Sequence, residues 1–222
     1  MLRDAIERGM KPDFVFYDPK TVDYELLALL QTHEADLAPV TAEVMAHISD
    51  TEQPPGILGV FPLPTPRLPR PVRRAIILDN VREPGNLGGI LRSAAAAGVD
   101  VAILSPGTAD PYNPKALRGG MGAHFRIPVI EAPWEDIAAY CAPLAVYIAA
   151  ADGDLSHDAP DWTQPWALVI GSEAHGISPE AAALSGRRLR IPMAAQTESL
   201  NAMVAAAVIL FEAQRQERAV SD

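Results

Sequence analysis

AIILDNVREPGNLGGILRS, residues 75–93, carries a strand, a turn and the start of a helix in succession. Residues 75–78 are all apolar and form a candidate buried strand. A Glu-Pro-Gly turn follows, and apolar side chains then recur at helical spacing over residues 86–97, up to Gly98 as a stop signal. An apolar strand that leads directly into a helix is typical of an α/β fold with a parallel sheet covered on both faces.

The same alternation extends to both ends of the chain. Further strands are predicted at 99–104, 125–130, 144–149, 167–170 and 188–191, and further helices at 114–122, 134–141, 179–184 and 200–217. The part before residue 62 predicts strands at 14–17, 37–40 and 57–61 and helices at 2–9, 24–31 and 42–48. The sequence therefore predicts a small α/β unit followed by a larger parallel α/β unit.

A proline-rich stretch separates these two parts. Prolines cannot lie in a helix interior or a central strand, so residues 62–74 are predicted to be an extended Pro/Arg-rich linker. The predicted domains are then 1–61 and 75–222. The arginines of this stretch either contact phosphates or only aid solubility: Arg67, Arg70, Arg73 and Arg74.

Composition excludes several classes of protein. The 222 residues are 49% hydrophobic and contain one cysteine, Cys141, which excludes a disulfide framework and a multi-cysteine zinc site. The five histidines lack the spacing of metal ligands, so no metal is expected. No apolar run is long enough to span a bilayer, and the start lacks the pattern of a signal peptide. We expect a cytoplasmic protein with no membrane partner.

The net charge of −10 is unevenly distributed. Residues 67–130 carry 9 basic and 4 acidic side chains, whereas residues 1–66 carry 4 and 11, and residues 131–222 carry 5 and 13. A basic middle segment between two acidic flanks leaves a nucleic-acid partner open, because such binding depends on local charge.

Three segments carry candidate chemistry. In the first, residues 78–93, Asn86 and Arg92 lie on the helix, and either can be purely structural, as an N-cap or as an ion-pair partner. The second, ALVIGSEAHGISPE at 167–180, places Glu173 in a loop beyond a buried strand, where α/β sheets bind ligands. The third, residues 190–212, places Ser199 and Asn201 before an alanine-rich helix, with Ser199 as a candidate cap. The dinucleotide, P-loop and esterase-elbow patterns are absent.

In this order, the three segments resemble motifs one, two and three of the SpoU (TrmH-like) branch of the SPOUT class of RNA methyltransferases. The resemblance covers residue 75 to the C-terminus, and residues 110–123 resemble the family's linking element. The first part is similar to the ribosomal-protein L30e-like substrate-binding domain, without the strand and basic stretch that normally open it. The resemblance therefore implies an L30e-like domain with a truncated N-terminus.

The resemblance also implies a fold and an activity. It implies a C-terminal trefoil knot, S-adenosyl-L-methionine as cofactor, and a homodimer with the active site at the subunit interface. The implied reaction is methylation of a ribose 2′-hydroxyl in RNA, with ribosomal RNA favoured over transfer RNA. A non-catalytic RNA-binding or cofactor-binding paralogue is a second hypothesis, and a small-molecule α/β enzyme is a third.

Residue roles follow from the matched motifs. The implied catalytic residues are Arg92, Asn86, Glu173, Ser199 and Asn201. The implied cofactor-binding residues are Ile170, Gly171, Ile191, Met193, Ser199 and Leu200. Lys115 and Arg118 join Arg67, Arg70, Arg73 and Arg74 as candidate RNA-binding residues. As a literal base Arg92 is disfavoured, because the pKa of a guanidinium exceeds ~12; stabilisation of an oxyanion is preferred.

Overall fold

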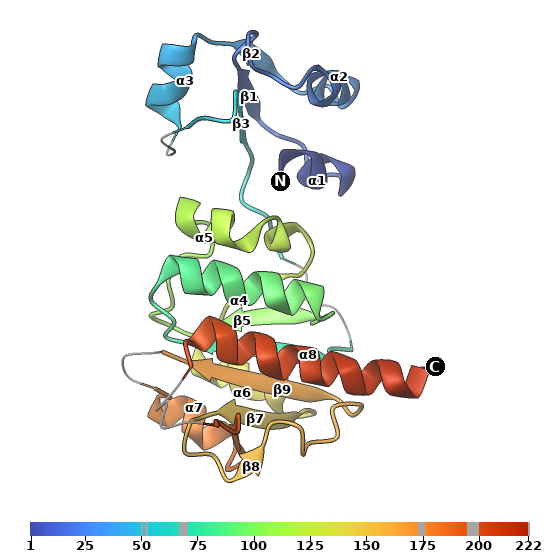
Figure 1. Ribbon diagram of the computed structural model, residues 1–222, viewed down its shortest axis with the longest axis vertical. Coiled ribbons are helices and arrows are strands. Elements are labelled where there is room, and N and C mark those ends of the chain that lie inside the picture. Colours follow the sequence, from blue (N-terminus) through green and yellow to red (C-terminus); the bar gives the residue numbers. More distant parts are fainter. Residues whose placement is uncertain (50, 52, 67–70, 173–175, 195–199, 222) are drawn as a thin grey trace. The chain divides into compact units, whose positions relative to one another are not determined.

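The chain folds into two compact units, Met1–Thr65 and Pro66–Asp222 (Figure 1). The computed structural model describes residues 1–49, 51, 53–66, 71–172, 176–194 and 200–221. Each unit has its own sheet and its own core.

The first unit contains a three-stranded sheet in the order β2-β1-β3. Strand β1 pairs in parallel with β2 and antiparallel with β3. Val15, Ile6 and Leu30 form the centre of its small core. The elements in chain order are α1 (Leu2–Glu7), β1 (Phe14–Tyr17), α2 (Tyr24–Thr32), β2 (Leu37–Pro39), α3 (Ala42–Ile48) and β3 (Ile57–Val60).

The second unit contains a seven-stranded sheet in the order β6-β5-β4-β9-β7-β10-β8. Every strand pair in it is parallel, which confirms the predicted α/β class. Its strands are β4 (Arg74–Asp79), β5 (Val101–Leu104), β6 (Val129–Glu131), β7 (Ala145–Ala149), β8 (Leu155–Ser156), β9 (Trp166–Gly171) and β10 (Arg188–Arg190). Its helices are α4 (Pro84–Ala96), α5 (Pro114–Gly120), η1 (Ala123–Phe125), α6 (Trp134–Cys141), α7 (Pro179–Leu184) and α8 (Ala202–Ser221).

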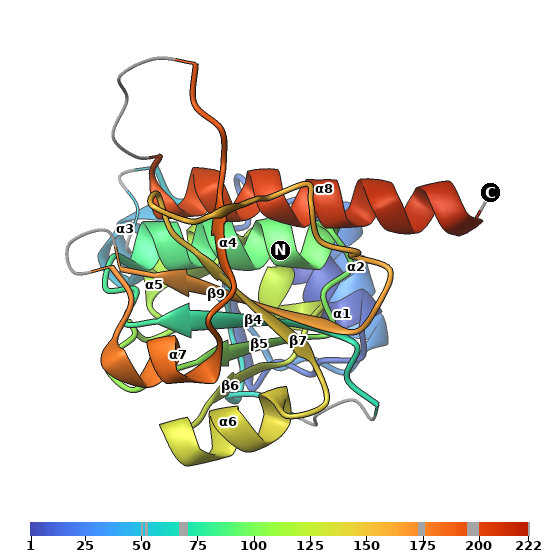
Figure 2. The same cartoon turned by 90° about the horizontal axis from the view of Figure 1, so that it is seen from below.

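Helices cover both faces of this sheet (Figure 2). Helices α4 and α8 pack on one face, where Leu87 and Leu210 join a large apolar core. Helices α6 and α7 pack on the other face, around Ile137 and Ala181. Residues of the central strand β4 alternate between the two cores, which explains why residues 75–78 of that strand are all apolar.

Strand β10 lies between β7 and β8, so the chain between those two strands has to cross over it. Gly153 lies in this crossing, and a Cβ atom there would be 2.6 Å from the carbonyl carbon of Leu189. The backbone of His157 then donates to the carbonyl of Arg190 at 2.9 Å. Residues 149–157 therefore enclose β10 from both sides.

The structure corrects three local predictions. The strand predicted at 125–130 starts only at Val129, because Gly122 adopts a left-handed conformation and opens the 3-10 turn η1. The last helix begins at Ala202, where the side chain of Asn201 caps it by accepting from the amides of Met203 and Val204. Strand β8 was not predicted, because two residues carry no periodicity.

Candidate functional site

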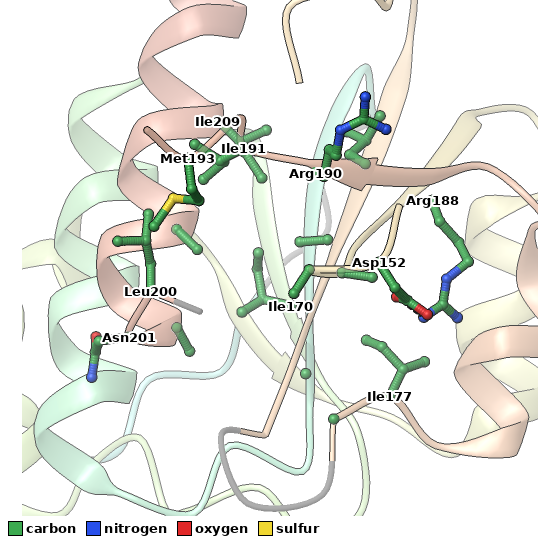
Figure 3. Close-up of a pocket in the computed structure, with 18 of the residues that line it drawn as sticks. Asp152, Ile170, Ile177, Arg188, Arg190, Ile191, Met193, Leu200, Asn201 and Ile209 are labelled. Carbon is green, nitrogen blue, oxygen red and sulfur yellow. Dashed lines mark hydrogen bonds and ion pairs between the residues drawn. The ribbon is translucent and has the colours of Figure 1, made fainter. Parts of the chain in front are cut away.

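A pocket of about 780 Å³ opens at the carboxyl ends of β7, β9 and β10, beside the start of α8 (Figure 3). This is the edge of a parallel sheet at which ligands bind, and the volume suits a small organic molecule. The lining residues are 149–152, 170–172, 176–177, 188–193, 200–202, 205 and 209.

One side of the pocket is apolar. Ile209 lies on helix α8, Met193 and Leu200 lie beside that helix, and Ile170 lies at the end of β9 (Figure 3). Met193 keeps 39% of its surface exposed, although a methionine side chain usually packs away from water. These side chains offer a partly exposed apolar wall to a bound ring or aliphatic chain.

Beyond Ile170, backbone groups of Gly171, Ser172 and Gly176 form part of the pocket wall. Ser172 and Gly176 pair with each other through two hydrogen bonds, of 3.0 and 2.8 Å. A Cβ atom at Gly171 would lie 2.5 Å from the carbonyl oxygen of Gly176, so only glycine fits there. The pocket therefore presents backbone groups at this point.

Asn86 and Asn201 meet at the end of the pocket nearest to α4. The amide Nδ2 of Asn201 donates to Oδ1 of Asn86 at 3.3 Å. Glu83, three residues earlier, caps α4 by accepting from the backbone N–H of Asn86 at 2.6 Å. The capping interpretation of Asn86 is thus wrong, and its side chain instead joins the first sequence segment to the third.

A hydrogen bond between Glu83 and Lys115 joins the starts of α4 and α5. The Nζ of Lys115 lies 2.5 Å from Oε1 of Glu83. This hydrogen bond, with the bond from the Asn86 amide, holds the pKa of the Glu83 carboxyl below its ordinary value. Lys115 is 61% exposed, so it stays accessible to an anionic partner.

The structure brings five predicted cofactor-binding residues to this one pocket: Ile170, Gly171, Ile191, Met193 and Leu200. Ser199 and Glu173 lie outside the described residues. Arg92 does not line the pocket. It is exposed on α4 and makes no side-chain hydrogen bond or ion pair with any residue that the structure describes. The ion-pair alternative for Arg92 therefore finds no partner within that part of the chain.

The predicted RNA-binding arginines lie apart from the pocket or outside the described residues. Arg67 and Arg70 belong to the undescribed part of the linker. Arg73 and Arg74 lie at the start of β4, the opposite edge of the sheet from the pocket. Arg74 forms ion pairs with Asp100 at 3.0 Å and Glu217 at 2.9 Å, so its guanidinium links β4 to α8. Arg118 is exposed in the last turn of α5.

One charged side of the pocket was not predicted from the sequence. Arg188 and Asp152 form an ion pair of 2.6 Å on the side opposite to Asn201 (Figure 3). Hydrogen bonding to Arg188 lowers the pKa of the Asp152 carboxyl. The signal was present, since Asp152 follows the buried strand β7 and polar residues beyond such strands form binding sites.

Two further observations concern the described residues alone. Within those ranges, no three histidine, cysteine or acidic side chains are grouped so as to hold a metal ion. None of the helices described is long and apolar enough to cross a membrane.

Comparison with known proteins identifies relatives over the whole chain. The model of the SpoU rRNA Methylase family matches residues 73–211. A mitochondrial rRNA methyltransferase 3A from Danio rerio is 36% identical over 100% of this chain. A 23S rRNA (uridine(2479)-2′-O)-methyltransferase from Streptomyces viridochromogenes is 33% identical, over 96% of this chain and 79% of its own length. The chain spans 63–66% of the length of the mitochondrial relatives from Danio rerio, Mus musculus and Homo sapiens.

Solved structures show the same fold. The crystal structure of the SpoU methyltransferase AviRb from Streptomyces viridochromogenes, in complex with the cofactor AdoMet, matches with a TM-score of 0.89. The match covers 98% of this chain and 87% of that one, at 29% sequence identity. The similarity thus includes both units of the chain.

Proposed function

The chain belongs to the SpoU rRNA methylase family, and from this premise we propose that it methylates a ribose 2′-hydroxyl of RNA with S-adenosyl-L-methionine. The main support for this proposal is the pocket at the carboxyl ends of the strands. The pocket has an apolar wall and a backbone wall at Gly171 and Gly176, and the Asn86–Asn201 contact lies at one end of it. Ribosomal RNA is the proposed substrate, because relatives with that activity in their names match nearly the whole chain.

The described residues fit the cofactor. A pocket of about 780 Å³ with Met193, Leu200 and Ile209 on one side suits a molecule that has both a flat ring and a flexible chain. Ile170, Gly171, Ile191 and Ser199 would complete the binding site. When bound, S-adenosyl-L-methionine supplies a methyl group on a positively charged sulfur.

The protein's share of the reaction is positioning and charge stabilisation. A ribose hydroxyl is a poor nucleophile until its proton leaves and its oxygen gains negative charge. Arg92 is exposed and unpaired among the described residues, so it can stabilise that oxygen with its guanidinium. Asn86 and Asn201 orient the reacting groups, with Glu173 and Ser199 as the remaining proposed participants.

A homodimer is part of this proposal. Arg92 does not line the pocket of its own subunit, and we infer that a second copy brings its Arg92 there. Helix α8 supports such an interface, because Val204, Val208 and Phe211 are 41%, 37% and 47% exposed along one side of it. A stripe of this kind is typical of a helix that packs on a partner.

We also propose a finer description of the fold of each unit. The enclosure of β10 by residues 149–157 supports a trefoil knot in the second unit. The mixed three-stranded sheet of the first unit supports an L30e-like substrate-binding domain.

Lys115 and Arg118 on α5 are the described cations that we propose contact RNA phosphates. A cytoplasmic location and the absence of a metal remain predictions.

Two measurements test the proposed function. Calorimetric titration with S-adenosyl-L-methionine should show one site per chain, and absence of binding at millimolar cofactor would contradict the proposal. Transfer of a labelled methyl group to total RNA, followed by mapping, should place the label on a ribose of ribosomal RNA. Cofactor binding without methyl transfer to any RNA would favour a non-catalytic paralogue. Label found in transfer RNA would identify transfer RNA, in place of ribosomal RNA, as the substrate.

A further inference from the structure

Asp79 is a buried carboxylate at the carboxyl end of β4 that the proposed reaction does not use. Its side chain is almost fully enclosed, with 1% of the residue surface exposed. The Oδ2 atom accepts a hydrogen bond from the backbone N–H of Ser178 at 2.6 Å. Burying a carboxylate is costly, and a short bond from a backbone N–H recovers part of that cost.

Ser178 belongs to the segment that returns from the pocket. The chain leaves the sheet at Gly171, whose backbone lies beside Asp79 in the β4–β9 pairing. It returns through Gly176 and Ile177, both of which line the pocket. Ser178 then starts α7, because its hydroxyl accepts from the backbone N–H of Ala181 at 3.1 Å. Asp79 therefore fixes the first residue after the pocket wall.

We propose that Asp79 is a positioning residue for the cofactor pocket. By holding the amide of Ser178, it keeps Gly176 and Ile177 at the distance from Ile170 that the cofactor needs. It touches neither cofactor nor RNA. This inference rests on the proposed function, and it adds a residue that acts on cofactor affinity through the pocket wall.

Asp100, which precedes β5, provides a matched control because it binds the opposite end of β4. The Oδ2 atom of Asp100 accepts from the backbone N–H groups of Arg73 and Arg74, at 2.9 and 2.8 Å. Both aspartates thus tie a backbone amide across the sheet, one beside the pocket and one at the edge away from it. Loss of either carboxylate should lower stability, but only Asp79 should affect cofactor binding.

The test is a calorimetric titration of the full chain with S-adenosyl-L-methionine, made on the wild type, Asp79→Ala, Asp79→Asn and Asp100→Ala. Asp79→Ala should weaken cofactor binding about tenfold, as loss of one charge-assisted hydrogen bond predicts. Asp79→Asn keeps an acceptor oxygen without the charge and should lie between Asp79→Ala and the wild type. Asp100→Ala should bind as the wild type does, despite a lower Tm. In methyl transfer, Asp79→Ala should raise the KM for the cofactor more than it lowers kcat.

Several outcomes would overturn the inference. One is a folded Asp79→Ala protein with wild-type cofactor affinity, and another is an equal loss of affinity in Asp100→Ala. If Asp79→Ala does not fold, Asp79→Asn decides, and wild-type affinity in that variant counts against the role. A wild type that binds no cofactor overturns the proposed function itself, and that result is visible before any variant is compared.

Discussion

At the scale of single residues, helix α4 carries two of the proposed catalytic side chains, Asn86 and Arg92, in different surroundings. Asn86 lies in the first turn of α4 and contacts Asn201 beside the pocket. Arg92 lies six residues, or less than two turns, further along and is exposed. A helix rises about 1.5 Å per residue, so the two side chains start about 9 Å apart along its axis. In the dimer that we propose, Asn86 would act at the pocket of its own subunit and Arg92 at the pocket of the partner subunit.

Substitution of Arg92 should separate catalysis from cofactor binding. Arg92→Lys keeps the charge but loses the planar guanidinium, and we expect turnover to fall on the order of a hundredfold. Cofactor affinity should stay at the wild-type value, because Arg92 is proposed to act on the ribose oxygen and is not among the residues that form the cofactor pocket of its own subunit. Labelled-methyl transfer and calorimetry measure the two quantities. Arg215→Lys, which changes an exposed arginine paired with Glu212 on α8, is the control and should keep full turnover.

The ion pair of Glu212 should add to the free energy of unfolding at neutral pH and lose this contribution as the carboxyl is protonated in acid. Hydrogen bonding to Arg215 lowers the pKa of the Glu212 carboxyl from 4.5 to about 2. A carboxyl with a lowered pKa in the folded state stabilises the protein above its ordinary pKa and loses this effect as the pH falls towards 2. The free energy of unfolding should therefore fall between about pH 4.5 and 2 more steeply in the wild type than in Glu212→Gln. Equal slopes in urea unfolding across this range would contradict the prediction.

At the scale of elements, two adjacent glycines in α4 have different neighbours. A Cβ atom at Gly88 would collide with the backbone carbonyl of Ala116 in α5, whereas one at Gly89 would collide with the sulfur of Met203 in α8. A backbone group cannot move aside, but a methionine side chain can rotate. The two positions therefore separate the effect of helix propensity from the effect of packing.

Gly88→Ala should destabilise the protein and Gly89→Ala should be nearly neutral. Helix propensity alone favours alanine by about 1 kcal/mol at both positions. Overpacking costs about 1–3 kcal/mol where neighbours cannot yield, so the net effect of Gly88→Ala should be to lower the free energy of unfolding by up to about 2 kcal/mol. At Gly89 the two effects should nearly cancel. Urea unfolding of both variants provides the comparison, and a stabilised Gly88→Ala protein would show that α5 shifts freely.

Local patterns predicted most of these elements, and their failures have physical reasons. The apolar strand β9 and the helix α6 follow from periodicity, and the structure places them where expected. Strand β8 exists only because Leu155 pairs with Leu189 on β10, a contact that no local pattern contains. At the site, the motifs predicted Ile170, Leu200 and their neighbours, whereas Asp152 and the contact between Asn86 and Asn201 depend on the folded chain.

At the scale of the whole molecule, the proposed dimer should depend on one side of α8. Phe211→Glu places a charge in the exposed apolar stripe, so we expect monomers in sedimentation and loss of methyl transfer. Val220→Glu is the control, because Val220 is 74% exposed near the end of the same helix and lies outside the stripe. A dimeric Phe211→Glu protein would place the interface elsewhere, and an active monomer would contradict the shared site.

The position of β10 has a consequence for how the protein is made. Strands β7 and β8 leave the ribosome before β10, yet they share it as their common neighbour. Until residues 188–190 have been synthesised, one edge of β7 and the whole of β8 stay without a partner, and open strand edges promote association between chains. The growing chain therefore needs protection late in synthesis, and slowing translation just before this segment should increase aggregation more than slowing it afterwards.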